Sequence, residues 1–519
     1  MTNRNFYELH KSFLAYGDKL AICRLKEKDV IQSITYKQLY NKVFNNYQNI
    51  YNSKIKHQNV CILTTDVINF TSALIALMLS GNTVTIYEQI TDQDSLDNYC
   101  KKLKERIADS KSEVLICDEA DISRLAKIDC RLLSFKELDK QVETSVEINE
   151  VRDGTLVQYS SGSTSVPKGI ILGDENILEN INESREIWGV IYEDKCLLWS
   201  KYSHLYGLAT SLLLPLSIGS SLYQVDTDEI LTNPAYLVEI ISKYKINFLG
   251  ALNFIYDLCT NYTSDDLDID LSSLRVAVVA GEIVKKKTLI EFYNKFKSKG
   301  FSFEAFCPSY GMTEMAGFVS VAAPASMSKS DESYSTSVGK PLQSKEVLII
   351  DDNNKLCGEG EPGEIVVIGG FIGYNKSSLN TDDLFYIEPS TNKKFFRTGD
   401  IGYIKNNQIY IASRKKEVIV QNGKKHYPID IENISCDAHS CFDKYVVAFS
   451  YLDNDLTEKV VIVQSVKDIK ADEVSSLVNK VRRDVYNKML INIDDIVFMK
   501  SIYFPLSKMG KILRKSVQE

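Results

Sequence analysis

Short apolar segments rich in β-branched residues alternate with longer amphipathic stretches over much of this chain. The apolar segments are VCILTT at Val60, NTVTIY at Asn82, EVLICD at Glu113, LLW at Leu197 and SSLYQV at Ser220. Helical spacing of apolar residues is found at Tyr236–Tyr244 and Lys287–Lys299. Because strands that alternate with helices usually pair in parallel, the sequence predicts an α/β fold with layered, largely parallel sheets.

The pattern changes twice in the second half of the chain. After about Leu342, the segments VLIID, EIVVIGG and QIYIAS follow one another with turn residues between them, which predicts a small β segment. From about Arg414 onward, the strand-like segments KYVVAFSY and EKVVIVQSV frame a helical stretch around 474–488. We therefore expect a large N-terminal domain of layered α/β subdomains with this β segment, followed by a small C-terminal α+β domain.

Composition argues against several classes of protein. The 519 residues correspond to about three folding units, and a hydrophobic fraction of 44% can fill their cores. A net charge of −8 without a basic block argues against a nucleic-acid or anionic-membrane partner. The eleven cysteines are scattered, as in reduced cytoplasmic proteins, and the longest apolar run, near Ala73–Leu79, is too short to cross a bilayer. These features predict a cytoplasmic protein without a membrane span.

A phosphate-binding loop is indicated by YSSGSTSVPKG at 159–169. Gly162 permits a close backbone approach to an anion, the neighbouring serines and threonine offer hydroxyls, and Lys168 adds a positive charge. The spacing differs from that of the Walker loop, so the segment does not indicate a kinase-type or GTPase-type site. A serine-rich linker is the alternative reading of this segment taken alone.

Five further segments follow in order. They are VVAGE at Val278, SYGMTE at Ser309, RTGD at Arg397, SRKKEVIVQNGKKHYPIDIE at Ser413 and LSKMGKILRK at Leu506. With the loop, this order resembles the adenylate-forming superfamily of acyl-CoA synthetases, luciferases, adenylation domains of peptide synthetases and fatty acyl-AMP ligases. The resemblance covers essentially the whole chain.

The segments QYSSGSTSVPKG, ALNFIYDLC, FEAFCPSYGMTE, KKHYPIDIE and RRDVYNKMLINIDDIVFMKS are most similar to fatty acyl-AMP ligases. That resemblance implies that ATP activates a carboxylic acid, typically a fatty acid, to an acyl-adenylate with release of pyrophosphate. The acyl group then passes to the phosphopantetheine thiol of an acyl carrier protein. Those ligases usually carry an insertion that is short here after Met315, so coenzyme A stays open as the acceptor. A non-catalytic nucleotide-binding scaffold is the alternative of another class.

The resemblance also implies roles for individual residues. Lys511 would bridge the substrate carboxylate and the α-phosphate, while Thr164 and Lys168 would hold the departing phosphates. Thr313 would contact the α-phosphate, and Glu314, with Thr164, would hold Mg²⁺, because carboxylate and hydroxyl oxygens suit this hard cation. The implied nucleotide-binding residues are Ser161, Gly162, Ser163, Thr164, Gly281, Glu282, Ser309, Tyr310, Gly311, Met312, Asp400 and Arg414.

The remaining implied residues concern the acyl group and the second half-reaction. The acyl pocket would be lined by His204, Tyr206, Gly250, Ala251 and Asn253, for which ordinary packing at strand ends is the alternative. Lys416 would be the hinge on which a mobile C-terminal domain turns, and Gly423 would act in thioester formation. The implied domains are residues 1–412 and 413–519, with the hinge near 413–416.

Overall fold

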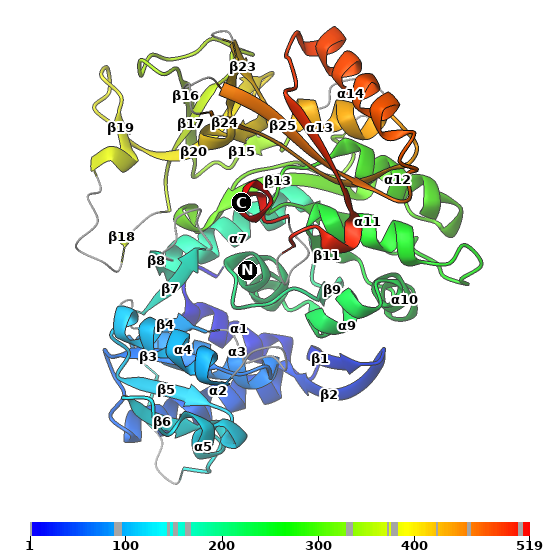
Figure 1. Cartoon of the computed structure of the whole chain (residues 1–519). Helices are drawn as coiled ribbons and strands as arrows, with labels where there is room; N and C mark the ends of the chain where they lie inside the picture. Colours follow the sequence, from blue (N-terminus) through cyan, green and yellow to red (C-terminus); the bar gives the residue numbers. More distant parts are fainter. Residues whose placement is uncertain are drawn as a thin grey trace.

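The computed structural model describes most of the chain (Figure 1). The described residues are 3–87, 96–142, 146–148, 154–160, 168–327, 336–370, 373–374, 382–421, 424–453, 458–506 and 512–519. Helices and strands alternate over the first three hundred or so of these residues, and strands dominate the next hundred. The expected α/β fold is therefore confirmed.

A nine-stranded sheet with the order β15-β14-β13-β12-β11-β9-β10-β1-β2 forms the centre of the large N-terminal part. Strands β13 through β1 in this order run parallel to one another. The strands are β15 (Lys340–Pro341), β14 (Gly317–Val321), β13 (Phe306–Met312), β12 (Val276–Val279), β11 (Phe248–Ala251), β9 (Lys195–Leu198), β10 (Ser221–Gln224), β1 (Leu20–Lys26) and β2 (Asp29–Thr35). Parallel pairing places the carboxyl ends of β9, β11, β12 and β13 at one edge.

A second, seven-stranded sheet has the order β18-β8-β7-β4-β3-β5-β6. Its strands are β18 (Gly373–Tyr374), β8 (Lys168–Gly173), β7 (Thr155–Ser160), β4 (Thr83–Ile86), β3 (Asn59–Leu63), β5 (Val114–Cys117) and β6 (Arg131–Ser134). Strands β7, β4, β3, β5 and β6 are parallel, whereas β7 and β8 form an antiparallel pair. The segment predicted to bind phosphate connects β7 to β8.

The two sheets share an apolar core. Helix α3 (Val67–Leu79) is buried over its whole length because it lies within this core and is apolar on all sides. The same core includes α1 (Phe6–Tyr16), α2 (Tyr36–Asn52), α6 (Phe135–Leu138), α7 (Asp174–Trp188), a π-helix (Gly207–Leu213) and α8 (Leu214–Ile218). Other clusters hold α9 (Thr227–Thr232), α10 (Ala235–Tyr244), α11 (Asn253–Tyr262) and α12 (Lys286–Phe296), and, on the second sheet, α4 (Leu96–Ser110) and α5 (Ile122–Leu125).

The predicted β segment follows as a five-stranded antiparallel sheet. It consists of β16 (Glu346–Ile350), β17 (Gly363–Ile368), β19 (Phe385–Ile387), β20 (Lys394–Lys405) and β21 (Gln408–Arg414). Residues of β17, β20 and β21 join the apolar cluster of the nine-stranded sheet. This contact fixes the position of β20 and β21 relative to β13.

The C-terminal part has a hydrophobic core of its own. Its elements are β22 (Ile419–Gln421), β23 (Lys424–His426), α13 (Pro428–Asp437), β24 (Phe442–Leu452), β25 (Glu458–Val466), α14 (Val474–Met489), β26 (Asp495–Lys500) and α15 (Arg514–Gln518). The expectation that two strands frame the helix is wrong, because β24 and β25 are antiparallel neighbours that both precede α14. Strand β26 follows the helix and pairs with β25 in parallel. The proposed boundary between residues 412 and 413 stays a prediction.

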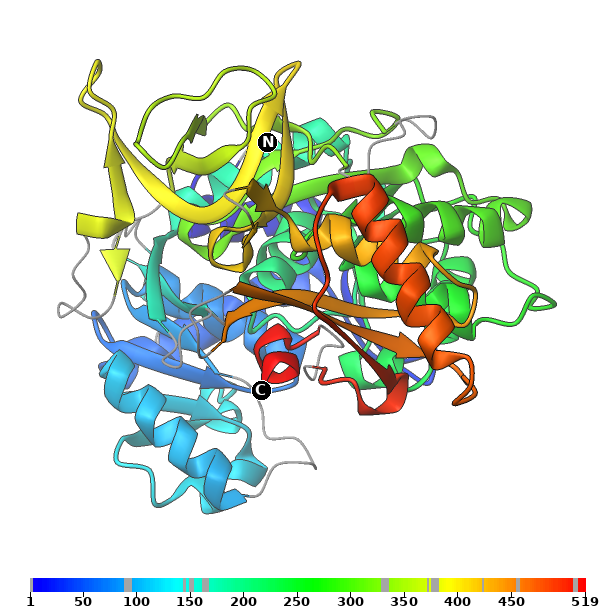
Figure 2. The ribbon, with the colours of Figure 1, turned by 45° about the horizontal axis from the view of Figure 1, so that its top comes forward.

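Ion pairs of described residues connect the C-terminal part to the rest of the chain. Lys287 Nζ lies 2.5 Å from Asp437 Oδ1, and Lys425 Nζ lies 2.5 Å from Asp352 Oδ2. Figure 2 shows the orange and red C-terminal elements in front of the green helices, with the yellow strands to one side. The side chains of both pairs are between about four-tenths and six-tenths exposed, so each pair adds little to stability.

Candidate active site

Two loops at the carboxyl edge of the nine-stranded sheet hold each other in place. Asn253, at the start of α11, accepts a hydrogen bond from the backbone N–H of Lys285 at 3.0 Å. In return, Glu282 Oε1 accepts one from the backbone N–H of Phe254 at 2.8 Å. Gly281 has a φ of +83°, a conformation that glycine adopts without strain. The structure thereby brings the predicted residues Gly281, Glu282 and Asn253 together between β11 and β12.

The carboxylate of Asp400, on the five-stranded sheet, connects that sheet to the nine-stranded sheet at this edge. The Tyr310 hydroxyl donates a 2.5 Å hydrogen bond to Asp400 Oδ2, and Arg414 Nε lies 2.9 Å from Asp400 Oδ1. Asp400 and Arg414 are partners across β20 and β21, which aligns their side chains. The backbone N–H of Asp400 donates to Thr398 Oγ1 at 3.0 Å, which fixes the strand at this residue. Three predicted nucleotide-binding residues from β13, β20 and β21 therefore form one contact group.

Burial differs sharply within this group. The side chain of Asp400 is 5% exposed, whereas that of Arg414 is 53% exposed. Burial, together with the negative charge of Asp400, raises the pKa of Tyr310 well above its usual value. Tyr310 therefore stays a neutral hydrogen-bond donor, and its ring offers an apolar face at the site.

A tight turn follows β13 and carries two predicted catalytic residues. Thr313 and Glu314 lie in the short helical turn Thr313–Met315, which ends at Ala316 with a φ of +58°. Glycine is required just before it, because a Cβ at Gly311 would lie 2.4 Å from the carbonyl oxygen of Gly317. The Asn180 side chain of α7 binds the backbone of the next strand through Phe318 at 2.7 and 2.8 Å. The backbone is thus held both before the turn, at Gly311, and after it, at Phe318.

Two other predicted residues of β13 have different surroundings. Ser309 is buried, and its hydroxyl donates to the carbonyl of Cys307 in the same strand at 3.1 Å. Met312 is partly buried and packs against the apolar cluster of the nine-stranded sheet. The structure therefore places Ser309 as a buried backbone contact, while Met312 stands directly before the turn Thr313–Met315.

Lys345 lies behind this turn and belongs to none of the motifs singled out in the sequence. Its side chain is buried, and its Nζ lies 2.9 Å from the position that a Cβ at Gly370 would take. The carbonyl oxygen of Met315 lies 2.5 Å from that same position. Burial lowers the pKa of Lys345, and the carboxylates of Glu179 and Glu183 on α7 partly offset this effect. A buried ammonium group therefore lies near the backbone of the turn Thr313–Met315.

The predicted acyl-pocket residues converge beside β11. The Tyr206 hydroxyl donates to the carbonyl of Ala251 at 3.2 Å, and Trp199 Nε1 donates to the carbonyl of Gly250 at 2.8 Å. A Cβ at Gly250 would lie 3.2 Å from Tyr206 Oη. His204 is partly exposed and stands one turn before the π-helix. Their assignment to the acyl group stays a prediction.

Several predicted residues lie outside the described part of the chain. They are Ser161, Gly162, Ser163, Thr164, Gly423 and Lys511. Lys168 begins β8, and its backbone pairs with Ser160 of β7. Tyr159, which directly precedes Ser160, contacts α4. Its hydroxyl donates to Asp109 at 2.7 Å, and the Arg106 guanidinium lies 3.4 Å from its ring centroid. The start of the loop is thereby fixed.

The predicted hinge follows β21 directly. Lys416 is exposed and lies in the short helical turn Lys415–Glu417. Its neighbour Lys415 is bound to Glu364 Oε2 of β17 at 2.9 Å, and Arg397 binds the same oxygen at 2.7 Å. The chain is thus held on the β segment up to the residue before Lys416.

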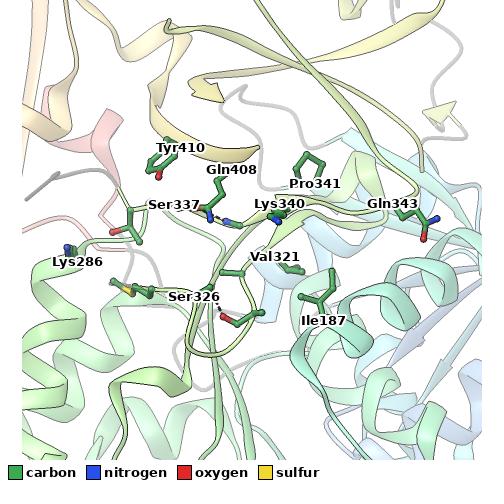
Figure 3. Close-up of a pocket in the computed structure, with 15 residues that line it drawn as sticks. Ile187, Lys286, Val321, Ser326, Ser337, Lys340, Pro341, Gln343, Gln408 and Tyr410 are labelled. Atoms are coloured by element: carbon green, nitrogen blue, oxygen red, sulfur yellow. Dashed lines mark hydrogen bonds between the residues drawn. The ribbon is translucent and has the colours of Figure 1, made fainter. Parts of the chain in front are cut away.

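A cavity of about 710 Å³ lies apart from these residues, between the end of β14, β15 and β21 (Figure 3). Its lining includes Val321, Lys340 and Tyr410, and none of the predicted site residues contributes to it. The candidate active site is therefore defined by the contacts at the carboxyl edge of the sheet and not by this cavity.

Comparison with known proteins identifies the class of this chain. Residues 9–373 match the family described as AMP-binding enzyme, so the chain belongs to that family. Residues 416–519 match the family described as Disco-interacting protein 2-like, AMP domain. The resemblance to adenylate-forming enzymes is therefore confirmed.

Three of the individual relatives are between 19% and 28% identical to this chain. The chain is 26% identical to the medium-chain-fatty-acid acyl-carrier-protein ligase JamA of Moorena producens, over 97% of this chain and 91% of the relative. It is 28% identical to the 4-hydroxyphenylalkanoate adenylyltransferase of Mycobacterium tuberculosis, over 70% of this chain and 64% of the relative. A structure from a study of fatty acyl-adenylate ligases of E. coli and L. pneumophila superposes with a TM-score of 0.83 at 19% identity, covering 99% of this chain and 97% of that one. The structural likeness supports the fold.

Two further features are absent from the described residues. No described helix combines the length and the apolar character needed to cross a membrane. Within the same residues, no cluster of three or more His, Cys, Asp or Glu side chains has the arrangement of a metal site.

The first prediction concerns Asp400. Replacing it in Asp400→Asn removes the negative charge that binds Arg414 and leaves one acceptor oxygen. We expect adenylate formation to fall by ~10- to 100-fold, the scale of one charged hydrogen bond. Pyrophosphate exchange into ATP measures this step. Asp29→Asn, which removes an exposed partner of Lys243, is the control, and equal activity of the two variants would contradict the assignment.

The second prediction concerns Lys345. The pKa of Lys345 is lower in the folded chain than in the unfolded chain, so the protonated group lowers the free energy of unfolding at neutral pH. This loss decreases only as the pH rises from the pKa of the folded chain toward that of the unfolded chain. Lys345→Met should therefore keep or raise the Tm while lowering adenylate formation by about tenfold, through loss of the charge behind the turn. Lys393→Met, at a half-exposed lysine paired with Glu346, is the control. A lower Tm with normal activity per folded molecule would refute the expectation.

Proposed function

We propose that this protein activates a carboxylic acid, of the fatty-acid class, with ATP and then transfers the acyl group to the phosphopantetheine thiol of an acyl carrier protein. Membership of the AMP-binding enzyme family and the fatty-acid ligases among its relatives support the proposal. The observation that carries it is the contact group of Tyr310, Asp400 and Arg414 beside the turn with Thr313 and Glu314. A carboxylate can accept hydrogen bonds from ribose hydroxyls, and a flat phenol ring beside it can pack against a base.

In the first half-reaction, a carboxylate oxygen of the acid attacks the α-phosphorus of ATP and pyrophosphate leaves. Negative charge develops on the phosphates, so the chain must supply positive charge and hydrogen-bond donors. We assign Thr313 to the α-phosphate, and Lys168 and Lys511 to the charged oxygens. Asp400 accepts hydrogen bonds from the ribose hydroxyls, and Arg414 keeps its carboxylate oriented.

A magnesium ion would neutralise phosphate charge when it is bound. Glu314 fits this role by chemistry, because a carboxylate oxygen is a hard ligand and its turn lies at the same sheet edge as Asp400. Thr164 is assigned as the second oxygen ligand on the sequence resemblance alone.

In the second half-reaction, the thiol attacks the acyl carbon, the bond to the adenylate oxygen breaks and AMP leaves. The thiol proton passes to solvent or to the departing phosphate. We assign Lys416, within the hinge region near 413–416, as the residue on which the C-terminal part reorients between the two steps, and Gly423 to the loop used in the second one. The chain position supports this assignment, since the preceding Lys415 is bound to β17.

The function is tested by incubating the protein with ATP, Mg²⁺ and a panel of fatty and aromatic acids, and by resolving the products by mass spectrometry. Parallel reactions contain holo acyl carrier protein, coenzyme A or neither. We expect acyl-adenylate that moves to the carrier protein. Efficient formation of acyl-coenzyme A would replace the proposed acceptor, whereas ADP or free phosphate as product would contradict adenylation itself.

The hinge assignment gives a third prediction. Lys416→Pro fixes φ at this residue and restricts the residue before it, so it should block the rotation. We expect adenylate formation to stay within about twofold of the original protein and carrier loading to fall by more than about tenfold. Lys416→Ala keeps the backbone free and serves as the matched control. Parallel loss of both steps in the proline variant would count against the hinge.

A further inference from the structure

Four buried hydroxyl groups gather beside the predicted acyl pocket without hydrogen-bond partners. They belong to Ser200, Ser203, Thr210 and Ser211. Of the seven partnerless buried hydroxyls in the described part of the chain, four thus fall within this one short stretch. Ser200, Thr210 and Ser211 are exposed by 6%, 2% and 0%. Because a buried polar group without a partner is costly, such a concentration calls for an explanation.

Several buried hydroxyls on other helices of this chain have partners, although that of Ser184 on α7 has none. Thr71 Oγ1 donates to the carbonyl of Val67 at 2.6 Å, and Ser80 Oγ donates to that of Ala76 at 2.9 Å. Ser217 Oγ, on α8 directly after the π-helix, donates to the carbonyl of Leu214 at 2.7 Å. Bonding to a carbonyl in the preceding turn is the usual solution for buried helical serine and threonine. Thr210 and Ser211 do not use it.

The local helix type accounts for part of this difference. Thr210 and Ser211 lie in the π-helix Gly207–Leu213, whose wider turns change the distance from a side chain to the preceding carbonyls. π-helical turns are rare and occur often at functional sites. The helix thus gives a second, independent indication that this stretch is built for a role other than packing.

Ser211 and Thr210 lie against Gly250, which is predicted to contact the acyl group, Ser211 with its hydroxyl and Thr210 with its methyl group. From the position of a Cβ at Gly250, Ser211 Oγ lies at 3.2 Å, Tyr206 Oη at 3.2 Å and Thr210 Cγ2 at 3.1 Å. Ser200 follows β9, the parallel neighbour of β11, and its Oγ lies 2.9 Å from the position of a Cβ at Gly207. The Ser211 hydroxyl therefore lies against β11, and that of Ser200 lies against the start of the π-helix.

We propose that Ser211, with Thr210 and Ser200, recognises a neutral oxygen carried by the acid substrate, either a hydroxyl or a carbonyl. This inference rests on the proposed function, because it requires the acyl group to lie beside Gly250. A serine or threonine hydroxyl can donate and accept, so it can pair with either kind of oxygen. Since these side chains and Tyr206 are uncharged, the site suits a neutral group better than a second carboxylate or an amine.

The preferred substrate would then be an oxygenated acid and not the plain hydrocarbon acid of the same size. A site that hydrogen-bonds a substrate oxygen discriminates against the analogue that lacks it, because its own polar groups then stay unpaired. The test measures kcat/KM for adenylate formation with matched pairs. Each pair consists of a phenylalkanoic or medium-chain acid and its hydroxy or oxo derivative of equal chain length.

We expect the original protein to prefer the oxygenated member of at least one pair by about tenfold or more. Ser211→Ala and the isosteric Thr210→Val should each lower this ratio by about fivefold or more, with no fall in Tm, because each removes a hydroxyl that has no partner in the protein. Ser217→Ala is the matched control, since its buried hydroxyl already has a partner, and it should keep the ratio.

Two results would overturn the proposal. Adenylation of the acids with no preference for an oxygenated member, or a preference that both variants retain, would refute the inference and leave the proposed function intact. Absence of adenylate from every acid would refute the proposed function and this inference with it.

Discussion

The carboxylate of Asp400 is the contact on which the arrangement of the site depends. It accepts a hydrogen bond from Tyr310 of the nine-stranded sheet and pairs with Arg414 of the β segment, while its own side chain is almost fully buried. A buried charge is tolerated only where it is paired and hydrogen-bonded. This requirement fixes β20 and β21 against β13, and it thereby also fixes the point at which the chain leaves for the C-terminal part.

Backbone geometry adds to this constraint. Parallel pairing of β11, β12 and β13 brings their loops to one edge, and the exchange of hydrogen bonds through Asn253 and Glu282 couples two of these loops. The absence of a side chain at Gly311 lets the strand after the turn approach closely. Charge stabilisation at such a site depends on groups that are already in position before the substrate arrives, and these contacts supply that order.

Much of this arrangement could be predicted from the sequence. The apolar segments at Val60, Leu197 and Ser220 became parallel strands because strand periodicity and length are local properties. The motif residues Tyr310 and Asp400 could be associated only through the family resemblance, since ninety positions separate them. Lys345 was missed because a lysine reads as a surface residue until packing buries it. The partnerless hydroxyls were missed because a π-helix has no recognised sequence signature here.

Attack of a carboxylate oxygen on the α-phosphorus of ATP is tested most directly by supplying an acid whose carboxylate carries a heavy oxygen isotope and by analysing the AMP released after transfer to the thiol. We expect AMP that has gained a single heavy oxygen, because the bridging atom of the adenylate stays with phosphorus when the acyl group leaves. Unlabelled AMP, or ADP in its place, would contradict it.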